Sequence, residues 1–521
     1  MMTPVPAEVG PSSGTISQVV SQGIPLQKNL KVFRTIVAIG AVQVVTMLFT
    51  LVRSKAVALT AGPAGVGAIS VVDQVVLLIA QISTFSLPYA SIKMLSAAHS
   101  EGRESFARGY SAFLRLLLVI SVLGAAVGIA LVWVRPSLLG SELLSYRSIV
   151  IVALIAIPAT NLTGLVTNAL AAARRVRASA LLGLVTAIAL ALASISGILF
   201  AGLYGYYVGN VIAVVALAIA GMFYLARAEG IGRPKGPVNP LKEVLRYPET
   251  LTFAGALYVI SFTTPLAYLV ARYAIVRNGG FEAAGLMQAA MGLSLALRTV
   301  MRSSNALFLT PAMNRRGEGE HKFQNAIEFS RGLALTIGIV ALPMVLFPDL
   351  GLRVLYSSRF TTAAPFVFVF VLAESLQLLA GVNQALLIGL NYIGSHVTIA
   401  VLADLSVAAI SWWLVPHYGV GGVALALLFS TILAFVLSSL RLRFGPKMAI
   451  HKDIGWLPFY VIVVIGIAGA IVSWSGSNSV IVILLKASFW AAFGLSLLKM
   501  ITRGNTNLVT SLRQLISLKA T

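Results

Sequence analysis

The sequence predicts an all-α membrane protein of about fourteen transmembrane helices, in which two parallel six-helix repeats surround a central cavity and two further helices follow. Three observations predict this class: the composition, the length of the apolar segments, and glycine-containing motifs that recur at nearly constant spacing. Of the 521 residues, 58% are hydrophobic and 10% are charged, and the mean hydropathy is +0.93. A soluble core does not need so much apolar surface, so the lipid bilayer must be the solvent of most of the chain.

The composition also excludes several kinds of chemistry. The chain has no cysteine, which excludes disulfides, thiolate metal sites and cysteine nucleophiles. It contains neither a GxxxxGK[ST] phosphate loop nor an HExxH zinc motif, so we expect no catalytic residue, metal or cofactor. The 38 basic and 16 acidic residues give a net charge of +22. In a membrane protein most of this positive charge lies in the loops that set the orientation in the membrane, and the rest is available to bind an anionic ligand. Nucleic acid is therefore not an expected partner.

The apolar segments define the expected spans, since about 20 apolar residues in a helix cross the hydrocarbon core. They lie at 33–52, 67–92, 109–134, 148–173, 178–200, 204–226, 250–271, 283–310, 326–347, 361–390, 394–414, 420–440, 455–473 and 479–499. The longest linker, residues 229–249, is basic and rich in Pro and Gly and divides the chain near its middle. The expected organisation is therefore a tail (1–30), a bundle (31–228), a cytoplasmic linker (229–249), a bundle (250–446), and two helices with a cytoplasmic tail (447–521).

The distribution of basic residues predicts the orientation. With an even number of spans both termini lie on one side of the membrane. The loops on that side carry basic clusters, for example Arg174, Arg175 and Arg177, and later Arg441, Arg443, Lys447 and Lys452. Because positive charge resists translocation, both termini are expected to be cytoplasmic. The first 30 residues lack the order of a signal peptide and predict a flexible tail.

Three pairs of motifs indicate an internal repeat. Gly62 and Gly67 in AGPAGVGAIS correspond to Gly280 and Gly285 in GGFEAAGLMQ, an offset of 218. TNALAAARR, from position 167, corresponds to NQALLIGLN at an offset of 216, and YGYYVGN, from position 204, corresponds to YGVGGV at an offset of 214. Equivalent loops lie on the same side, so the repeats are parallel. Parallel repeats typically enclose a midplane site and rock about it.

The segment LVRSKAVALTAGPAGVGAISVVDQVVLLIAQISTFSLPYASIKMLS resembles the first two helices of the Wzx-type polysaccharide flippases, including O-antigen flippases. This resemblance extends over roughly residues 30–500 and implies a place in the multidrug/oligosaccharidyl-lipid/polysaccharide (MOP) exporter superfamily, with a MATE-like fold. It implies flipping of undecaprenyl-diphosphate-linked oligosaccharide across the bacterial inner membrane for O-antigen, capsule or exopolysaccharide synthesis. It also implies bilayer lipids, a polysaccharide polymerase and chain-length machinery as partners.

Charged residues inside spans are functional hypotheses, because a charge at the bilayer centre costs about 2.5–3.5 kcal/mol. Arg298 lies about 15 residues into its span, some 20 Å deep at 1.5 Å per residue, and Arg302 lies on the same helix face. Guanidinium groups bind phosphate oxygens through charge-assisted pairs, so both arginines are candidate diphosphate ligands. The alternative for Arg298 is internal pairing with Glu374 or Asp404.

Three further cations are candidates at helix ends. Arg53 and Arg272 close matching spans at the outer face, where snorkelling is the plain explanation and a role at the cavity rim is the alternative. Lys93 ends a span on the cytoplasmic side and is either an entry contact for an anionic headgroup or a product of the positive-inside bias.

The buried acids Asp73, Glu374 and Asp404 are candidate proton or sodium sites, or else ion-pair partners of buried arginines. The aromatic pairs Trp412–Trp413 and Tyr206–Tyr207 lie near expected membrane interfaces, where aromatic belts form.

The sequence leaves competing functions open. A multidrug/cation antiporter of the same superfamily would be expected to have an acidic cavity. Arg298 and Arg302 would instead repel a cationic drug. A lipid-linked peptidoglycan precursor flippase would share both fold and cationic cavity. A membrane enzyme such as a polymerase or glycosyltransferase would be expected to carry a long outer loop or an acidic sugar-nucleotide site, and the outer loops here are short.

Overall fold

The computed structural model describes residues 26–135, 140–230, 238–246, 248–304, 319–444, 452–474 and a few positions between 486 and 495. Across these residues the chain is almost entirely helical and contains no β-strand. The expected N-terminal tail lies outside the described residues up to position 25, as does the C-terminal end from position 496.

The first half of the chain holds α2 (Leu26–Thr84), α3 (Leu87–Glu101), α4 (Arg103–Val134), α5 (Gly140–Leu143), η2 (Leu144–Tyr146), α6 (Arg147–Ile155), α7 (Ile157–Ala172), α8 (Val176–Glu229) and α9 (Pro240–Leu245). The second half holds α10 (Pro248–Ser304), α12 (Gly319–Leu346), α13 (Pro348–Leu355), η4 (Ser358–Ala363), α14 (Ala364–Gly389), α15 (Ile393–Tyr418), α16 (Val420–Phe444) and α17 (Lys452–Trp474). Each expected span up to 455–473 coincides with a helix, a half helix or two helices in succession. The last expected span, 479–499, lies mostly outside the described residues.

Many of these helices are of membrane length. Within the described part, eight are long and apolar enough to cross a bilayer, or nine if the pair Ile337–Leu346 and Pro348–Leu355, bent by 90°, forms one span. Three of the eight extend over 40, 53 and 42 residues and contain an internal break, so each is long enough for two spans. The chain is therefore a multi-pass membrane protein.

The breaks in α2 and α10 confirm the first pair of repeat motifs. Gly62 interrupts α2 with φ 64° and ψ −170°, and Gly280 interrupts α10 with φ 71° and ψ −176°. Glycine reaches this left-handed φ without the steric cost that a Cβ imposes. Two glycines 218 residues apart thus turn the chain in the same way.

The other two repeat motifs correspond with a corrected register. Gly202 in α8 and Gly419 after α15 both have positive φ, 59° and 52°, which gives an offset of 217 where the motifs predict 214. Arg174 and Asn391, φ 59° and 66°, occupy equivalent turns, again 217 apart where the motifs predict 216. The turns at Arg174 and Asn391 are closed by equivalent backbone hydrogen bonds. In each turn the amide of the next residue donates to the carbonyl five residues before that amide, at 2.8 Å.

The stretch AGPAGVGAIS differs from its expected form. A loop of several residues is predicted between spans 33–52 and 67–92, whereas the helix continues to the single break at Gly62 and resumes at Pro63. Proline is favoured in the first turn of a helix because the missing N–H has no intrahelical partner there. Arg53, expected at a helix end, therefore lies nine residues inside the helix.

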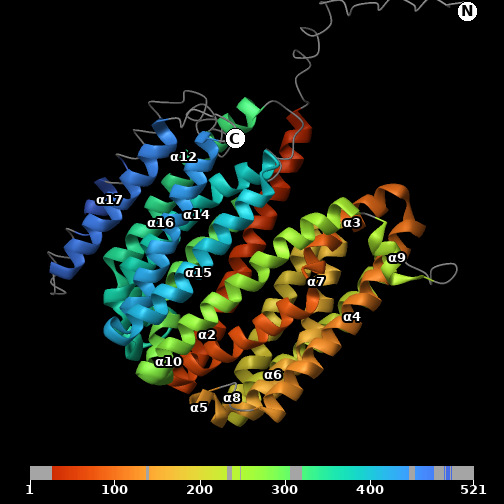
Figure 1. Cartoon of the computed structure of the whole chain (residues 1–521), viewed down its shortest axis with the longest axis horizontal. Helices are drawn as coiled ribbons and strands as arrows, with labels where there is room; N and C mark the ends of the chain where they lie inside the picture. Colours follow the sequence, from red (N-terminus) through yellow and green to blue (C-terminus); the bar gives the residue numbers. More distant parts are fainter. Residues whose placement is uncertain are drawn as a thin grey trace, which may run out of the picture.

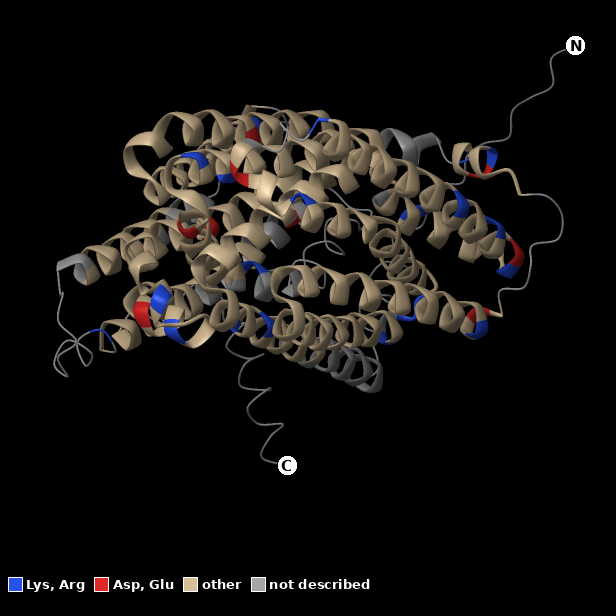
Figure 2. Ribbon diagram, turned by 90° about the horizontal axis from the view of Figure 1, so that it is seen from below, with Lys and Arg blue, Asp and Glu red and all other residues tan. Residues whose placement is uncertain are grey.

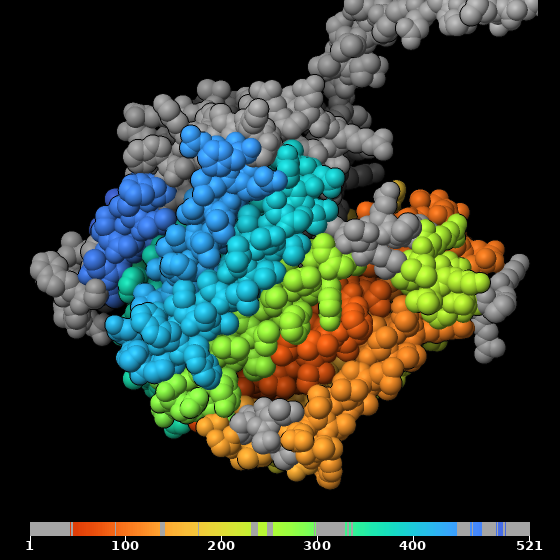
Figure 3. All heavy atoms as spheres, in the orientation of Figure 1, coloured from red at the N-terminus to blue at the C-terminus, as the bar shows by residue number. Residues whose placement is uncertain are grey.

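The two halves meet along α2 and α10. In Figure 1 these two helices lie between the remaining first-half helices, at lower right, and the second-half helices, at upper left. Figure 3 shows the green atoms of α10 filling the line between the two halves on this face. A Cβ at Gly67 would lie 1.9 Å from the carbonyl oxygen of Phe281, and a Cβ at Gly285 would lie 1.9 Å from that of Pro63. The backbones of the two halves touch here, which requires glycine at both positions.

Polar bonds also cross between the halves. The buried Gln74 amide donates to the carbonyl of Pro265 at 2.9 Å, and Lys55 Nζ donates to the carbonyl of Val354 in α13 at 2.9 Å. Charged residues otherwise gather mainly near helix ends, and only a few lie along the helices in Figure 2. These few define the candidate site.

Candidate functional site

Three of the cavities within the described residues contain candidate site residues. The central cavity, about 520 Å³, lies between the halves and is lined by α2 on one side and mainly by α10 on the other. The second-half pocket, about 170 Å³, lies among α10, α14, α15 and α16 and shares lining residues with the central cavity. The first-half pocket, about 230 Å³, lies near the Gly62 break.

Arg272 is a buried cation of the central cavity. It lines this cavity and is 5% exposed. One terminal nitrogen donates to Gln288 Oε1 at 2.9 Å, the other approaches the carbonyl of Tyr268 at 3.5 Å, and its buried Nε has no partner within the described residues. No described carboxylate lies within ion-pair distance of it. The α10 helix continues to Gly279, so Arg272 is not the snorkelling residue that a helix end at 271 predicts.

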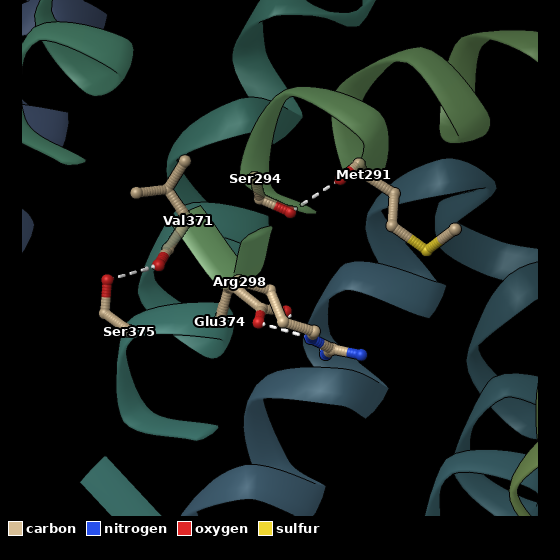
Figure 4. Close-up of polar contacts among 6 residues, drawn as sticks. All are labelled: Met291, Ser294, Arg298, Val371, Glu374 and Ser375. Carbon is tan, nitrogen blue, oxygen red and sulfur yellow. Dashed lines mark hydrogen bonds and ion pairs between the residues drawn. The ribbon is translucent and has the colours of Figure 1, made fainter. Parts of the chain in front are cut away.

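Arg298 forms a two-pronged ion pair with Glu374. Its Nε and Nη2 donate to Oε1 and Oε2 at 2.6 and 2.7 Å, and Figure 4 shows the two side chains pointing toward each other from α10 and α14. Glu374 is buried, whereas the side chain of Arg298 is 32% exposed and lines both the central cavity and the second-half pocket. Internal pairing, one of the two alternatives for Arg298, is therefore observed. The remaining exposed part of the guanidinium faces the cavities.

Removing one member of this pair tests its contribution. Glu374→Gln is expected to lower the free energy of unfolding by about 2 kcal/mol, less than the ~3–5 kcal/mol for a fully buried pair because Arg298 is partly exposed. The double substitution Glu374→Gln with Arg298→Gln should regain part of this loss, since no unpaired charge remains. Thermal unfolding of the purified single and double variants measures both effects. Additive losses would contradict coupling between the two residues.

Asp404 lies in the second-half pocket without a cationic partner among the described residues. Its Oδ2 accepts hydrogen bonds from the hydroxyls of Thr263 at 2.8 Å and Thr264 at 2.7 Å. Both threonines come from the first part of α10, and Asp404 from α15. Hydroxyl donors therefore compensate this carboxyl group in place of an arginine.

The first-half pocket brings Arg53 and Asp73 together with two tyrosines. Arg53 donates to the Tyr206 hydroxyl, and Asp73 accepts from the Tyr207 hydroxyl at 2.8 Å. Both tyrosines are buried, at 3% and 5% exposure, so their expected place in an interfacial belt is wrong. Trp412 and Trp413, at 47% and 70% exposure, remain compatible with such a belt.

Of the two remaining predicted ligands, one lies away from these cavities and the side chain of the other is not described. Lys93 is an exposed residue of α3 and lines none of the three cavities. The backbone of Arg302 belongs to α10, but its side chain lies outside the described part of the chain. Within the described residues, no group of three or more His, Asp or Glu side chains could hold a metal ion.

Several polar residues around Arg298 are not predicted from the sequence. Gln377 and Gln384 share a face of α14 with Glu374, since they follow it by three and ten residues, and His396 shares a face of α15 with Asp404. All of them line the second-half pocket. The signal was a row of polar side chains at helical spacing within apolar spans. This pattern predicts a polar pocket only once the two helices are known to face each other.

Solved structures of other proteins share the fold of this chain. No protein-family model and no curated protein sequence matches the chain. Among solved structures, the lipid II flippase MurJ in an inward closed conformation is similar with a TM-score of 0.64 and 12% identity, over 89% of this chain and 97% of that one.

Two MATE transporter structures are also similar. The MATE transporter VcmN of Vibrio cholerae has a TM-score of 0.60 and 17% identity, over 82% of this chain and 98% of that one. An outward-facing multidrug resistance MATE transporter of the MOP superfamily has a TM-score of 0.58 and 12% identity, over 80% and 96%. The chain therefore has the helical fold shared by MurJ and the MATE transporters of the MOP superfamily.

Proposed function

We propose that this protein is a flippase that carries undecaprenyl-diphosphate-linked oligosaccharide units across the bacterial inner membrane by alternating access. The observation that carries the proposal is Arg272, a buried cation in the central cavity without a carboxylate partner among the described residues. An unpaired buried charge is costly and is retained where a ligand supplies the opposite charge. The partly exposed Arg298 lines the same cavity and provides a second guanidinium.

The chemistry of the cavity fits a lipid diphosphate. Two arginines can hold the four or so acceptor oxygens of a diphosphate through charge-assisted hydrogen bonds. The rest of the wall is partly apolar, with Leu77, Leu257 and Leu295 among its residues, which suits the first part of a polyprenyl chain. Because the charged residues that line this cavity are both arginines, a cationic drug would be repelled, which argues against a multidrug/cation antiporter.

A lipid-linked peptidoglycan precursor is the second candidate substrate. One similar structure is that of a lipid II flippase, and the two candidate substrates present the same diphosphate to Arg272 and Arg298. The resemblance of the segment from Leu51 to Ser96 to the Wzx-type flippases favours the oligosaccharide. We further propose cytoplasmic termini, from the basic loops, and an ion-coupling role for Asp73 and Asp404, whose carboxyl groups line pockets beside the cavity.

Proteoliposomes test the proposed activity. Vesicles are loaded with fluorescent undecaprenyl-diphosphate-linked oligosaccharide, and its accessibility to an impermeant quencher is followed over time. The full chain is expected to equilibrate the lipid between leaflets at least about tenfold faster than protein-free vesicles. Equal rates, together with uptake of a cationic dye, would reject the flippase in favour of the antiporter. Equal acceleration of a lipid-linked peptidoglycan precursor would reject the choice of substrate.

A further inference from the structure

The second-half pocket contains polar side chains for which the fold provides no partners. Gln377 and Gln384 line it, and neither side-chain amide has a hydrogen bond within the described residues. His396 is 9% exposed, and its Nδ1 is buried and also without a partner among the described residues. Buried polar groups are nearly always hydrogen-bonded, so the unpartnered imidazole nitrogen is unusual. The two glutamine amides are only partly buried, and with the imidazole they give the pocket three polar side chains that are available to a ligand.

These side chains come from two helices that face each other across the pocket. Gln377 and Gln384 lie seven residues apart, and therefore on one face of α14. His396 and Asp404 lie eight residues apart on one face of α15. The Oδ2 atom of Asp404 receives both threonine hydroxyls, which leaves Oδ1 available to accept a further hydrogen bond.

The donor and acceptor pattern identifies the class of ligand. Each amide and the imidazole can both donate and accept, and the free carboxylate oxygen accepts. A sugar ring presents hydroxyl groups that also donate and accept, together with apolar C–H faces that suit Phe370 and Met291 in the wall. A hard cation would instead need a cage of oxygen ligands, whereas an unpartnered imidazole forms part of this wall. The volume of about 170 Å³ has room for several waters, and hence for a single ring.

The position of the pocket identifies which sugar it would take. Arg298 and Tyr268 line both this pocket and the central cavity, so a diphosphate held at Arg298 lies at the mouth of the pocket. We infer that the second-half pocket is a subsite for the first monosaccharide ring of the substrate, the ring joined directly to the diphosphate. This inference rests on the proposed function, because it presupposes that Arg272 and Arg298 hold the diphosphate.

Binding of two lipid probes to the full-length purified protein tests the subsite. One probe is undecaprenyl diphosphate, and the other is the same lipid with one hexose attached to the diphosphate. The unmodified chain should bind the hexose-bearing lipid at least about tenfold more tightly, because a site built around hydroxyl groups discriminates against a ligand that lacks them. Gln377→Leu, Gln384→Leu and His396→Leu should each reduce this ratio severalfold. Because His396 also lines the central cavity, unchanged affinity for the bare diphosphate lipid is expected of the two glutamine variants, and it also shows that these variants are folded.

A control and two contrary outcomes keep the subsite separate from the proposed function. Thr398→Val alters an exposed residue of α15 whose hydroxyl bonds its own helix, and it should leave the ratio unchanged. If both probes bind with equal affinity, or if the ratio survives all three leucine substitutions, the sugar subsite is wrong while the diphosphate site stands. If Arg272→Gln leaves binding of both probes intact, the proposed function fails, whatever the three pocket variants do.

Discussion

Arg272→Gln is expected to weaken binding of undecaprenyl diphosphate by about 100-fold, because truncating one partner of a buried charge pair costs about 2–5 kcal/mol. The same substitution should leave the melting temperature unchanged or raise it. In the ligand-free protein Arg272 is a buried charge without a described carboxylate partner, and its removal relieves a desolvation cost. Lipid binding and thermal unfolding of one purified preparation measure both effects.

The opposite signs of these two effects make this prediction specific. Arg277→Gln is the matched control, since Arg277 lies five residues further along α10, is exposed and stacks on the Trp412 ring at 5.8 Å. It should change neither binding nor stability appreciably. A loss of binding by Arg272→Gln with a parallel loss of stability would assign Arg272 a structural role and remove the observation that carries the proposed function.

Gly67→Ala is expected to destabilise the protein by about 3 kcal/mol, the upper end of the usual cost of overpacking. The added Cβ would lie 1.9 Å from the carbonyl oxygen of Phe281, and a backbone atom cannot move aside as the end of a flexible side chain can. The two halves must therefore separate at this point. Thermal unfolding measures the loss, and thiol labelling of a single Gln81→Cys reporter in the central cavity measures the separation, because the chain contains no other cysteine.

Gly183→Ala provides the control for this substitution. A Cβ at Gly183 meets nothing within 4 Å, and alanine in an open helical position stabilises by about 0.5–1 kcal/mol relative to glycine. The same change is thus expected to have opposite signs at the two positions. If Gly67→Ala is as stable as the unmodified protein and labels at the same rate, the close contact between the halves is not a constraint on the fold.

The fold was predictable from sequence to the extent that it depends on local features. Apolar length defines spans, and Gly62 and Gly280 encode the same left-handed turn, so the repeat was visible before the structure. Helix ends were less accurate, because basic residues such as Arg53 and Arg272 were taken to mark the membrane edge. The helices continue past both residues to the glycine breaks. The register of the later motifs differs by one and three residues because the turns depend on backbone conformation. Arg174 and Asn391, for example, have the same left-handed conformation although their residue types differ.

The site was predictable only residue by residue. Helical depth singles out Arg298 and allows either ligand binding or internal pairing, but the choice of Glu374 as its partner depends on a contact between residues 76 positions apart. Arg272 was undervalued because its burial results from packing of α10 against α2. The glutamines of α14 carry no charge, so their presence in an apolar span does not by itself predict a binding site. Their place in a polar pocket is recognised only when α14 is seen to face α15.

The glycine contact between the halves has a mechanical consequence. Gly285 and Arg298 are 13 residues apart on one helix, a lever arm of about 20 Å at 1.5 Å per residue. A tilt of about 10° at the contact would shift the far end of that arm by about 3 Å, a full hydrogen-bond length. Arg272, Arg298, Glu374 and Asp404 all belong to the second half and would travel together, while the wall formed by Gln74 and Gln81 recedes. In the proposed cycle the lipid substrate would stay bound to the second half while that half moves, and its route through the membrane would open between the two halves.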